Sequence, residues 1–440
     1  MQYLYLDNLR GFNNTIVPIK DVNFLVGENS TGKTTILNLF YLMNKIEFWM
    51  TQAFNDYNLQ FGPFNEIINI KSENQSTFSL GLIEKSLRGK SNFYFILLTF
   101  ENFDQSPYLS QVNYISNNQE IGISIPIPRD GLESKKAREN ITIKYLYKKT
   151  EKQIFSEELI RTKITEWNKI KRDAYKSLKI SYYRTLWHIF FSITEAEKIN
   201  ISKIQIGFFD LPLNDIAYIA PIRSKPKRTY DESYRIDFTP EGAHTPYLLR
   251  NILRKDGDSV RNKDLKNLLN LFGKNSGLFD KLYVKPYSNA LDSPFTINVN
   301  FKGKNFKIIN TGYGVSQSLP IVVELLVRNP GAAFAIQQPE VHLHPRAQAT
   351  LGDLIYYLVV RQNKKFTIET HSDFIIDRFR LNCKRNNKKQ ISAQVLFFEK
   401  TRKGNNAIPI SIEKNGQYSE IQPKNFRDFF MNEDLALLGI

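Results

Sequence analysis

Short runs of apolar residues alternate with polar turns through the N-terminal part of the chain. Residues 3–6 and 15–19 are two such runs, and the polar and glycine residues between them are typical of a hairpin. Further runs at 68–70, 77–82 and 93–100 predict additional short strands. Because consecutive short strands most simply pair antiparallel, we expect an antiparallel sheet here.

Between about residues 129 and 200 the pattern changes to a basic segment with helical spacing. We expect a basic, largely helical insertion, and the absence of a sustained heptad run argues against a long coiled-coil arm. Its lysines, interleaved with aromatic residues, could grip a nucleic-acid backbone, but a solvated helical face is an equally good interpretation. The positions concerned are Lys135, Lys136, Arg138, Lys144, Tyr145, Tyr147, Lys148, Lys149, Lys152, Trp167, Ile170, Tyr175, Leu178, Tyr182, Tyr183, Leu186 and Ile189.

The remainder of the chain alternates apolar strand-like runs with helical patterns, which is typical of an α/β protein. The expected strands are 216–220, 332–336, 365–370, 395–398 and 408–412, and the expected helices are 242–254, 265–272 and 319–327.

A glycine-rich stretch from Gly27 to Thr35 joins the apolar run 23–26 to a second apolar run at 36–40. It reads Gly, four residues, Gly-Lys-Thr, which is the phosphate-binding pattern in its strand-turn-helix context. The glycines let backbone N–H groups surround phosphate oxygens, and the helix start directs its positive end at them. Lys33 supplies a cation for the β- and γ-phosphates, and Thr34 a hydroxyl for Mg²⁺. We therefore predict a polyphosphate site for ATP with Mg²⁺.

Composition indicates the kind of chain that carries this loop. With 440 residues, 42% of them hydrophobic, the chain can bury a full core, in two lobes or domains. The formal charge of +16 favours DNA or another polyanion as a partner, although solvated lysines would also account for it. The single cysteine, Cys383, excludes an internal disulfide and suits a reducing compartment. No apolar run is long enough to cross a bilayer, so we expect a cytoplasmic protein without membrane contact.

Two loops outside the glycine-rich stretch also carry candidate chemistry. Residues 310–318 form a second glycine-rich turn, followed by an apolar helix whose N-terminus could face an anion. Residues 221–228, Pro-Ile-Arg-Ser-Lys-Pro-Lys-Arg, make a basic loop directly after a strand. The glycine-rich turn alone is weak evidence for a site. The position of the basic loop at a strand end makes it a site candidate, in which Arg223, Lys227 and Arg228 could contact nucleotide phosphates, DNA or an acidic partner.

Four motifs occur in order along nearly the whole chain: GENSTGKT at 27–34, NTGYGVSQ at 310–317, QQPEVHLHP at 337–345 and THSD at 370–373. Together they resemble the ABC-class ATPases of the OLD-like group, which are related to chromosome-maintenance and break-repair ATPase heads. The resemblance extends to Arg10-Gly11-Phe12 and to the stretch YIAPIRSKPKR, as in the subgroup whose short members carry no nuclease domain.

The resemblance implies an α/β fold, an ABC-type P-loop ATPase head with a mixed sheet, an antiparallel N-terminal subdomain and a helical insertion. The domains expected are 1–128, an ATPase lobe with the phosphate loop, 129–290, the basic insertion, and 291–440, a second ATPase lobe with the other motifs. The resemblance also places a signature that meets the γ-phosphate across a dimer, and a switch histidine. The nucleotide-binding residues implied are Arg10, Asn29, Ser30, Gly32, Lys33, Thr34, Thr35, Thr311, Gly312, Gly314 and Ser316, the catalytic group is Gln338, Glu340 and His371, and the Mg²⁺ residues are Thr34 and Gln337.

The chain departs from the family at the end of the strand before Pro339. There the family has an acid that holds Mg²⁺ through water, then a glutamate that orients the attacking water, and here those positions are Gln337 and Gln338. A glutamine cannot take a proton, and a neutral amide holds Mg²⁺ less well than a carboxylate. Hydrolysis is therefore expected to be weak or absent, unless the nearby Glu340 substitutes.

A transition-metal cluster is an alternative explanation for the histidines, since imidazole is a good ligand and alternate positions of an extended segment share a face. Its members would be His342, His344 and His371, completed by Glu340, Glu369 and Asp373.

The function expected from these observations is an ATP-binding sensor scaffold that forms homo-oligomers through head-to-head dimers. By resemblance to ATPase subunits of anti-phage systems such as Septu and PARIS, it would regulate a separate nuclease of the HNH or toprim type. No acidic cluster of a toprim nuclease follows the ATPase lobe in the tail from Ala393 to Ile440. The alternatives are an ATP-hydrolysing DNA-repair or chromosome-associated ATPase, and a nucleic-acid-binding protein with a vestigial nucleotide site.

Overall fold

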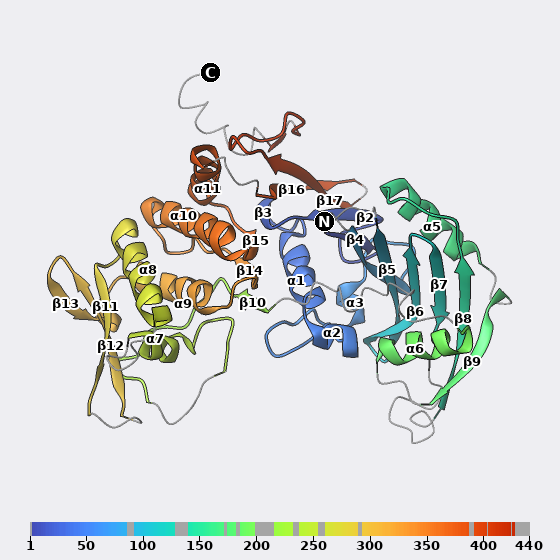
Figure 1. Cartoon of the computed structure of the whole chain (residues 1–440), viewed down its shortest axis with the longest axis horizontal. Coiled ribbons are helices and arrows are strands. Elements are labelled where there is room, and N and C mark those ends of the chain that lie inside the picture. Colours follow the sequence, from blue (N-terminus) through green and yellow to red (C-terminus); the bar gives the residue numbers. More distant parts are fainter. Residues whose placement is uncertain are drawn as a thin grey trace.

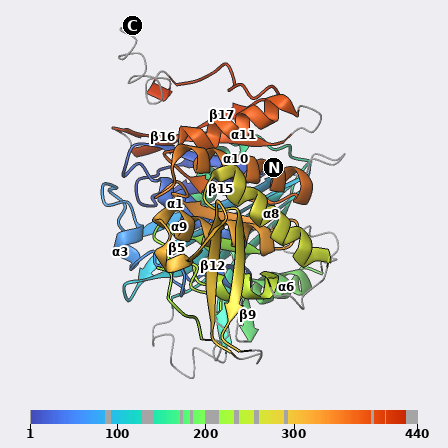
Figure 2. The ribbon, with the colours of Figure 1, turned by 90° about the vertical axis from the view of Figure 1, so that its left-hand side faces the viewer.

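The computed structural model extends along one axis, with a sheet at each end and helix α1 near the middle (Figure 1). Seen along that axis, β12 and α8 lie in front of the central elements (Figure 2). The described residues are 2–85, 92–127, 140–170, 174–181, 185–198, 215–231, 237–253, 260–288, 293–386, 391–402, 404–423 and 425–426.

An eight-stranded antiparallel sheet begins with the first two strands of the chain, as the alternating pattern predicted. Residues Leu4 and Val17 face each other in that hairpin. The order is β2-β1-β4-β5-β6-β7-β8-β9. The strands are β1 Gln2–Asp7, β2 Thr15–Ile19, β4 Thr77–Lys85, β5 Phe93–Phe103, β6 Ser106–Ser116, β7 Gln119–Ser124, β8 Asn140–Lys149 and β9 Lys176–Ser181.

A six-stranded sheet carries the phosphate loop, in the order β10-β14-β15-β3-β16-β17. The first five strands are parallel and β17 pairs antiparallel with β16. Because parallel strands end at the same edge, the residues that follow β3, β14 and β15 meet there. The strands are β3 Val22–Gly27, β10 Ile216–Ile219, β14 Ala333–Gln337, β15 Lys365–Glu369, β16 Ala393–Thr401 and β17 Gly404–Ile412.

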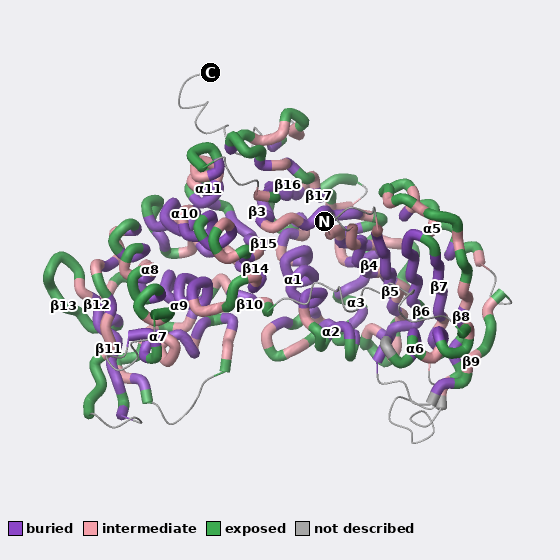
Figure 3. The backbone as a smooth tube through the Cα atoms, viewed as in Figure 1, coloured by how far each residue is buried: buried purple, intermediate pink, exposed green. Residues whose placement is uncertain are grey.

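Strand β3 is buried on both faces, which explains its nearly continuous apolar sequence. Leu25 packs in one core with residues of α1, whereas Phe24 and Val26 pack in a second core with residues of α9, α10 and α11. Figure 3 shows the buried residues running through α1 and the central strands.

One polar side chain, Asn23, lies in the middle of β3 and is completely buried. It hydrogen-bonds to backbone groups of Lys20 at 2.8 Å, to the hydroxyl of Thr367 on β15 at 3.2 Å, and to the amide of Gln394 on β16 at 2.8 Å. The Asn23 amide therefore joins the three central strands.

Helices cover the sheets, and two of those over the six-stranded sheet, α10 and α11, begin with a side-chain cap. Helix α10 starts with Pro345 after a His344 cap, and α11 starts after Ser372, whose hydroxyl accepts from Ile375 N. A third sheet has three strands, β11 Lys281–Pro286, β12 Phe295–Phe301 and β13 Lys304–Lys307. The helices are α1 Lys33–Met43, α2 Ile46–Thr51, α3 Phe64–Ile67, α5 Glu157–Lys169, α6 Leu186–Ala196, α7 Thr245–Leu253, α8 Val260–Ser276, α9 Tyr313–Val327, α10 Pro345–Gln362 and α11 Asp373–Arg385.

The mixed α/β fold class with an antiparallel N-terminal sheet is as expected, but two local expectations are wrong. Residues 68–70 do not form a strand, because the Asn69 side chain accepts from Lys71 N in a turn and Ile70 is exposed. Residues Asn140–Lys149 and Lys176–Ser181 form strands β8 and β9 within the segment that was expected to be largely helical. In β9 the strand replaces the expected helical spacing. Its apolar side chains alternate, with Ile180 buried, and β8 offers it a pairing edge.

The basic segment is only partly within the described residues. Lys135, Lys136, Arg138, Tyr182 and Tyr183 lie outside them. Within them, the lysines proposed to grip nucleic acid are exposed, namely Lys144, Lys148, Lys149 and Lys152. Two of the aromatic residues, Tyr145 and Trp167, are buried in cores. Over the same described ranges, no helix has the length and hydropathy needed to cross a membrane.

Candidate functional site

The loop between β3 and α1 has the backbone that its glycines permit. Gly27 has φ 143°, and a Cβ there would collide with the carbonyl oxygen of Phe398 on β16. Gly32 has φ 97° at the start of α1, where a Cβ would collide with the ring of Phe12. Both positions therefore require glycine.

Lys33 is held inside this loop and is 4% exposed. Its ammonium donates to the carbonyl oxygens of Gly27 at 2.7 Å and Glu28 at 2.6 Å. Burial lowers the pKa of Lys33, while the nearby carboxylates of Glu369 and Glu28 act in the opposite direction. The loop thus keeps a cation at the floor of the site.

A cavity of about 710 Å³ opens beside the loop, a volume within the usual range for small-molecule sites. The expected residues of the phosphate loop, the preceding arginine and both glutamines meet there, as do polar residues from the β16–β17 turn. The lining includes Arg10, Asn29, Ser30, Gly32, Lys33, Thr34, Thr35, Gln337, Gln338, Glu369, Lys400, Arg402 and Asn405.

Arg10 is fixed at one side of this cavity. Its guanidinium donates to the carbonyl oxygen of Phe61 at 3.0 Å, lies 5.0 Å from the centre of the Phe61 ring, and approaches the hydroxyl of Thr35 at 3.5 Å. Burial lowers the pKa of Arg10, and the charge of Glu66 raises it. The arginine remains a cation positioned near the start of α1.

Thr34, in the first turn of α1, points at the ends of β14 and β15. Its hydroxyl lies 2.8 and 3.0 Å from the two carboxylate oxygens of Glu369, and 3.5 Å from the amide nitrogen of Gln337. Gln337 and Glu369 are direct neighbours across the parallel pair. Burial raises the pKa of Glu369, whereas the hydrogen bond from Thr34 and the charge of Lys33 lower it.

The orientation of Gln337 is set by Tyr218 on β10, whose hydroxyl donates to the amide oxygen at 3.1 Å. The Gln337 oxygen is thereby turned to Tyr218 and the nitrogen to Thr34. Gln338 follows with φ 43°, and its N–H donates to the carbonyl oxygen of Glu369 at 2.8 Å.

Glu340 holds the loop that contains the expected switch histidine. One carboxylate oxygen accepts from the Thr370 hydroxyl and the other from the N–H of His371, both at 2.7 Å. Partial desolvation lowers the pKa of His371, and the charge of Lys33 lowers it further. Beneath this loop, buried Arg223 donates to the carbonyl oxygen of Gln338 at 3.1 Å, and burial lowers the pKa of Arg223 to about 10.

The signature-like residues form a separate group at the start of α9. Gly312 precedes the helix, the Thr311 hydroxyl donates to the carbonyl oxygen of Ile308, and the Ser316 hydroxyl donates to that of Tyr313. Gly314 lies against Leu278 and the carbonyl of His342. These residues are outside the lining of the phosphate-loop cavity within one chain.

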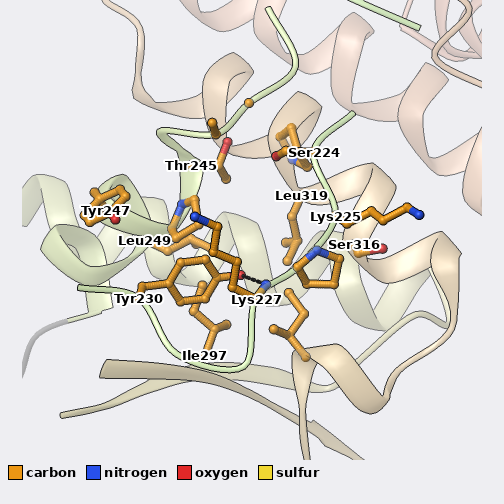
Figure 4. Close-up of a pocket in the computed structure, with 16 residues that line it drawn as sticks. Ser224, Lys225, Lys227, Tyr230, Thr245, Tyr247, Leu249, Ile297, Ser316 and Leu319 are labelled. Atoms are coloured by element: carbon orange, nitrogen blue, oxygen red, sulfur yellow. Dashed lines mark hydrogen bonds between the residues drawn. The ribbon is translucent and has the colours of Figure 1, made fainter. Parts of the chain in front are cut away.

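Figure 4 shows a small pocket that is lined by Ser316 of α9 and by residues of the basic loop 221–228. Its volume is about 80 Å³, less than a nucleotide needs, and its lining includes Lys225, Lys227 and Leu319. The N–H of Lys227 donates to the hydroxyl of Tyr230 at 2.9 Å there. This pocket is a packing feature of the loop and not a second nucleotide site.

The transition-metal alternative finds no support in the described part of the chain, where no three His, Cys, Asp or Glu residues gather around one point. His344 caps α10, and the ring of His342 faces that of Tyr313 at 5.6 Å. Mg²⁺ has different needs, since one carboxylate, a hydroxyl and the phosphates of a nucleotide can hold it. The hydroxyl of Thr34 and the carboxylate of Glu369 are oxygen donors of that kind.

Sequence reasoning considered Glu369 only as a member of the histidine cluster and missed its contact with Thr34. The available signal was its place at the end of a strand that runs parallel to β3. It also missed Asn405, whose N–H donates to the carbonyl oxygen of Gly11 at 2.7 Å, because a turn about 370 residues from the loop carries no local signal.

Comparisons with known proteins give the following. Among solved structures, the Smc head bound to the C-winged helix domain of ScpA is similar over 94% of this chain and 98% of its own, with 11% identity and a TM-score of 0.43. The SMC head domain from Thermotoga maritima is similar over 92% and 97%, with 10% identity and a TM-score of 0.38. No curated protein matches the sequence significantly. The family described as the AAA ATPase domain, AAA_15, matches residues 1–376.

That match covers most of the chain, including the phosphate loop, the signature-like turn and the switch-like segment. The protein therefore belongs to the AAA ATPase domain family AAA_15.

Proposed function

We propose that this ATPase-family protein is an ATP-binding sensor scaffold of the OLD-like group, in which nucleotide controls assembly and hydrolysis is weak or absent. The phosphate loop, the Lys33 ammonium and the cavity beside them support nucleotide binding. Bound ATP would act as a ligand that stabilises one assembly state, to the extent that it binds that state more tightly.

The single observation that carries the proposal is the chemistry at the end of β14. Gln337 and Gln338 occupy the positions where the family has an acid that holds Mg²⁺ and a glutamate that orients the attacking water, and an amide cannot accept a proton from that water. Glu340, the nearest other candidate, has each carboxylate oxygen engaged by the loop at Thr370 and His371. The Glu340 carboxylate therefore already holds the loop at Thr370 and His371.

The position of the signature-like residues supports a head-to-head dimer. They lie outside the cavity formed by their own phosphate loop, so a second copy is needed to bring a signature to the bound nucleotide. Tyr313, the first residue of α9, is 60% exposed beside them and available to such a contact.

The proposed partner is a separate nuclease of the HNH or toprim type, within an anti-phage defence role, and DNA is a further proposed partner. The net charge of +16 and the exposed lysines of β8 support contact with a polyanion. A nuclease gene beside the gene for this protein would support the pairing, and co-purification of the two products, with and without ATP, tests it directly.

Phosphate release from ATP tests the proposed lack of hydrolysis, with wild type, Gln338→Glu and Glu340→Gln compared at equal nucleotide occupancy. We expect negligible turnover by the wild type despite ATP binding, and a gain for Gln338→Glu because it restores a base. Light scattering with and without ATP would follow assembly in the same samples. Brisk wild-type turnover that Glu340→Gln abolishes would favour a hydrolysing DNA-repair or chromosome-associated ATPase. Absence of ATP binding would favour a nucleic-acid-binding protein with a vestigial site.

A further inference from the structure

We propose that Glu369, at the end of β15, is the carboxylate through which this chain binds the Mg²⁺ of its nucleotide, together with the hydroxyl of Thr34. Position 337 carries no acid, and Glu369 supplies one at the neighbouring position of the adjacent strand. This inference rests on the proposed ATP binding and adds the residue on which its Mg²⁺ dependence depends.

Because of the strand register, an acid at position 369 lies close to the place of an acid at position 337. Gln337 on β14 pairs with Glu369 on β15, and Glu369 pairs with Leu25 on β3, just before the phosphate loop. The two strand ends therefore lie side by side under the start of α1. A carboxylate at 369 reaches the Thr34 hydroxyl at 2.8 and 3.0 Å, which places it beside the residue that offers its hydroxyl to Mg²⁺.

The Gln337 amide is turned the wrong way to bind a cation. Its oxygen accepts the hydrogen bond from Tyr218, and its nitrogen faces Thr34. An amide nitrogen donates protons and offers no lone pair to a metal ion. The expectation that Gln337 would hold Mg²⁺ is therefore replaced by a site at its neighbour.

The other acids near the cavity have different neighbours. Glu66 is the only other acid in the described lining, and it lies on α3, where its charge acts on Arg10. The carboxylate of Glu340 is bound by Thr370 and His371. Glu369 is the acid that contacts Thr34.

The surroundings of Glu369 also favour a cation. The residue is 4% exposed, and a buried carboxylate is costly unless opposite charge or hydrogen bonds compensate for its lost hydration. The ammonium of Lys33 lies near enough to act on this carboxylate, but it is held by two backbone carbonyl oxygens of its own loop. The Thr34 hydroxyl has a single proton, which can satisfy one of the two carboxylate oxygens at a time. A divalent ion coordinated by the carboxylate and the nucleotide phosphates would supply the remaining compensation.

Binding of a non-hydrolysable ATP analogue, measured by calorimetry in Mg²⁺ and in EDTA, tests the proposal without relying on turnover. Wild type should bind more tightly in Mg²⁺. Glu369→Gln should lose about tenfold or more of its affinity in Mg²⁺, since even the outer partners of metal ligands are worth about 10–100-fold. In EDTA the same variant should bind equally or more tightly, because the negative charge that repels the phosphates is gone.

Two further variants sharpen the test. Glu399→Gln makes the same chemical change on β16, at the other side of β3, where Glu399 pairs with Asn406. Glu399→Gln should bind the analogue with the same Mg²⁺ dependence as wild type. If Glu399→Gln also lost the Mg²⁺ dependence, the effect of Glu369→Gln would be one of general charge. The double variant Gln337→Glu/Glu369→Gln returns the acid to β14 and should recover Mg²⁺ dependence that Glu369→Gln alone has lost.

The outcomes separate this inference from the proposed function. Full Mg²⁺ dependence in Glu369→Gln would overturn the inference and leave ATP binding intact. Weakening by the same factor in Mg²⁺ and EDTA, with circular dichroism unchanged, would show a structural role and overturn it as well. If wild type bound no nucleotide under either condition, the proposed function itself would be wrong.

Discussion

The buried amide of Asn23 allows a quantitative prediction about the strand that carries the phosphate loop. The variant Asn23→Ala removes hydrogen bonds to the Thr367 hydroxyl on one side and the Gln394 amide on the other, both completely buried. A buried polar group that loses its partner costs about 1–3 kcal/mol. Two such groups give a loss of about 2–6 kcal/mol in the free energy of unfolding, a large share of the roughly 5–15 kcal/mol typical of a folded domain.

Urea denaturation measures this loss when it is followed by circular dichroism and by tryptophan fluorescence, to which the buried Trp49 contributes. The control is Asn406→Ala, which makes the same truncation at an exposed position of β17 and should change stability by no more than about 0.5 kcal/mol. A loss below about 1 kcal/mol for Asn23→Ala, similar to the control, would refute the reasoning, since it would mean that the amide does not hold the three strands together.

Three further predictions concern cations. Lys33→Ala should weaken ATP binding and ATP-dependent assembly without unfolding the protein, because its ammonium is the cation of the phosphate loop; calorimetry showing unchanged affinity would contradict this. Reversing the charge of Lys148, Lys149 and Lys152 should weaken the salt dependence of DNA binding. The slope of log affinity against log salt concentration should fall by about one unit for each phosphate that the variant no longer neutralises. A slope equal to that of wild type would exclude these exposed lysines from the interface. Burial lowers the pKa of Lys364 in the folded protein to about 8, whereas the pKa of an unperturbed lysine is 10.5. Between these two pH values the unfolded chain keeps a proton that the folded protein has released. Stability should therefore rise with pH across that window, and Lys364→Met should flatten the rise in urea titrations at several pH values.

Local chemistry made much of the ATPase core predictable from the sequence. The phosphate loop is a contiguous pattern whose glycines are required by the positive φ of Gly27 and Gly32. Apolar runs flanked by turns also located β14, β15 and β16 correctly, because strands buried on both faces leave a strong signal.

What the sequence did not predict depends on which segments become neighbours. Strand β9 exists because β8 offers an edge to residues whose alternating pattern is short and lies next to helical spacing. The contact between Thr34 and Glu369 joins positions 335 residues apart, and it follows from strand order, which no local pattern encodes. For the same reason the motif position of Gln337 does not encode its orientation, which depends on Tyr218 from another strand.

The position of β3 in the six-stranded sheet has a consequence for synthesis of the protein on the ribosome. Its neighbours β15 and β16 contribute partners such as Phe366 and Ala393 for Val22, the latter about 370 residues later in the chain. At about 5–20 residues per second, roughly 20–70 s separate the appearance of β3 from that of β16. The phosphate loop emerges before these two strands and cannot be held between them until β16 has been translated. Competence to bind nucleotide would thus require synthesis through β16, and nascent fragments that lack β16 would not compete for ATP or join an assembly.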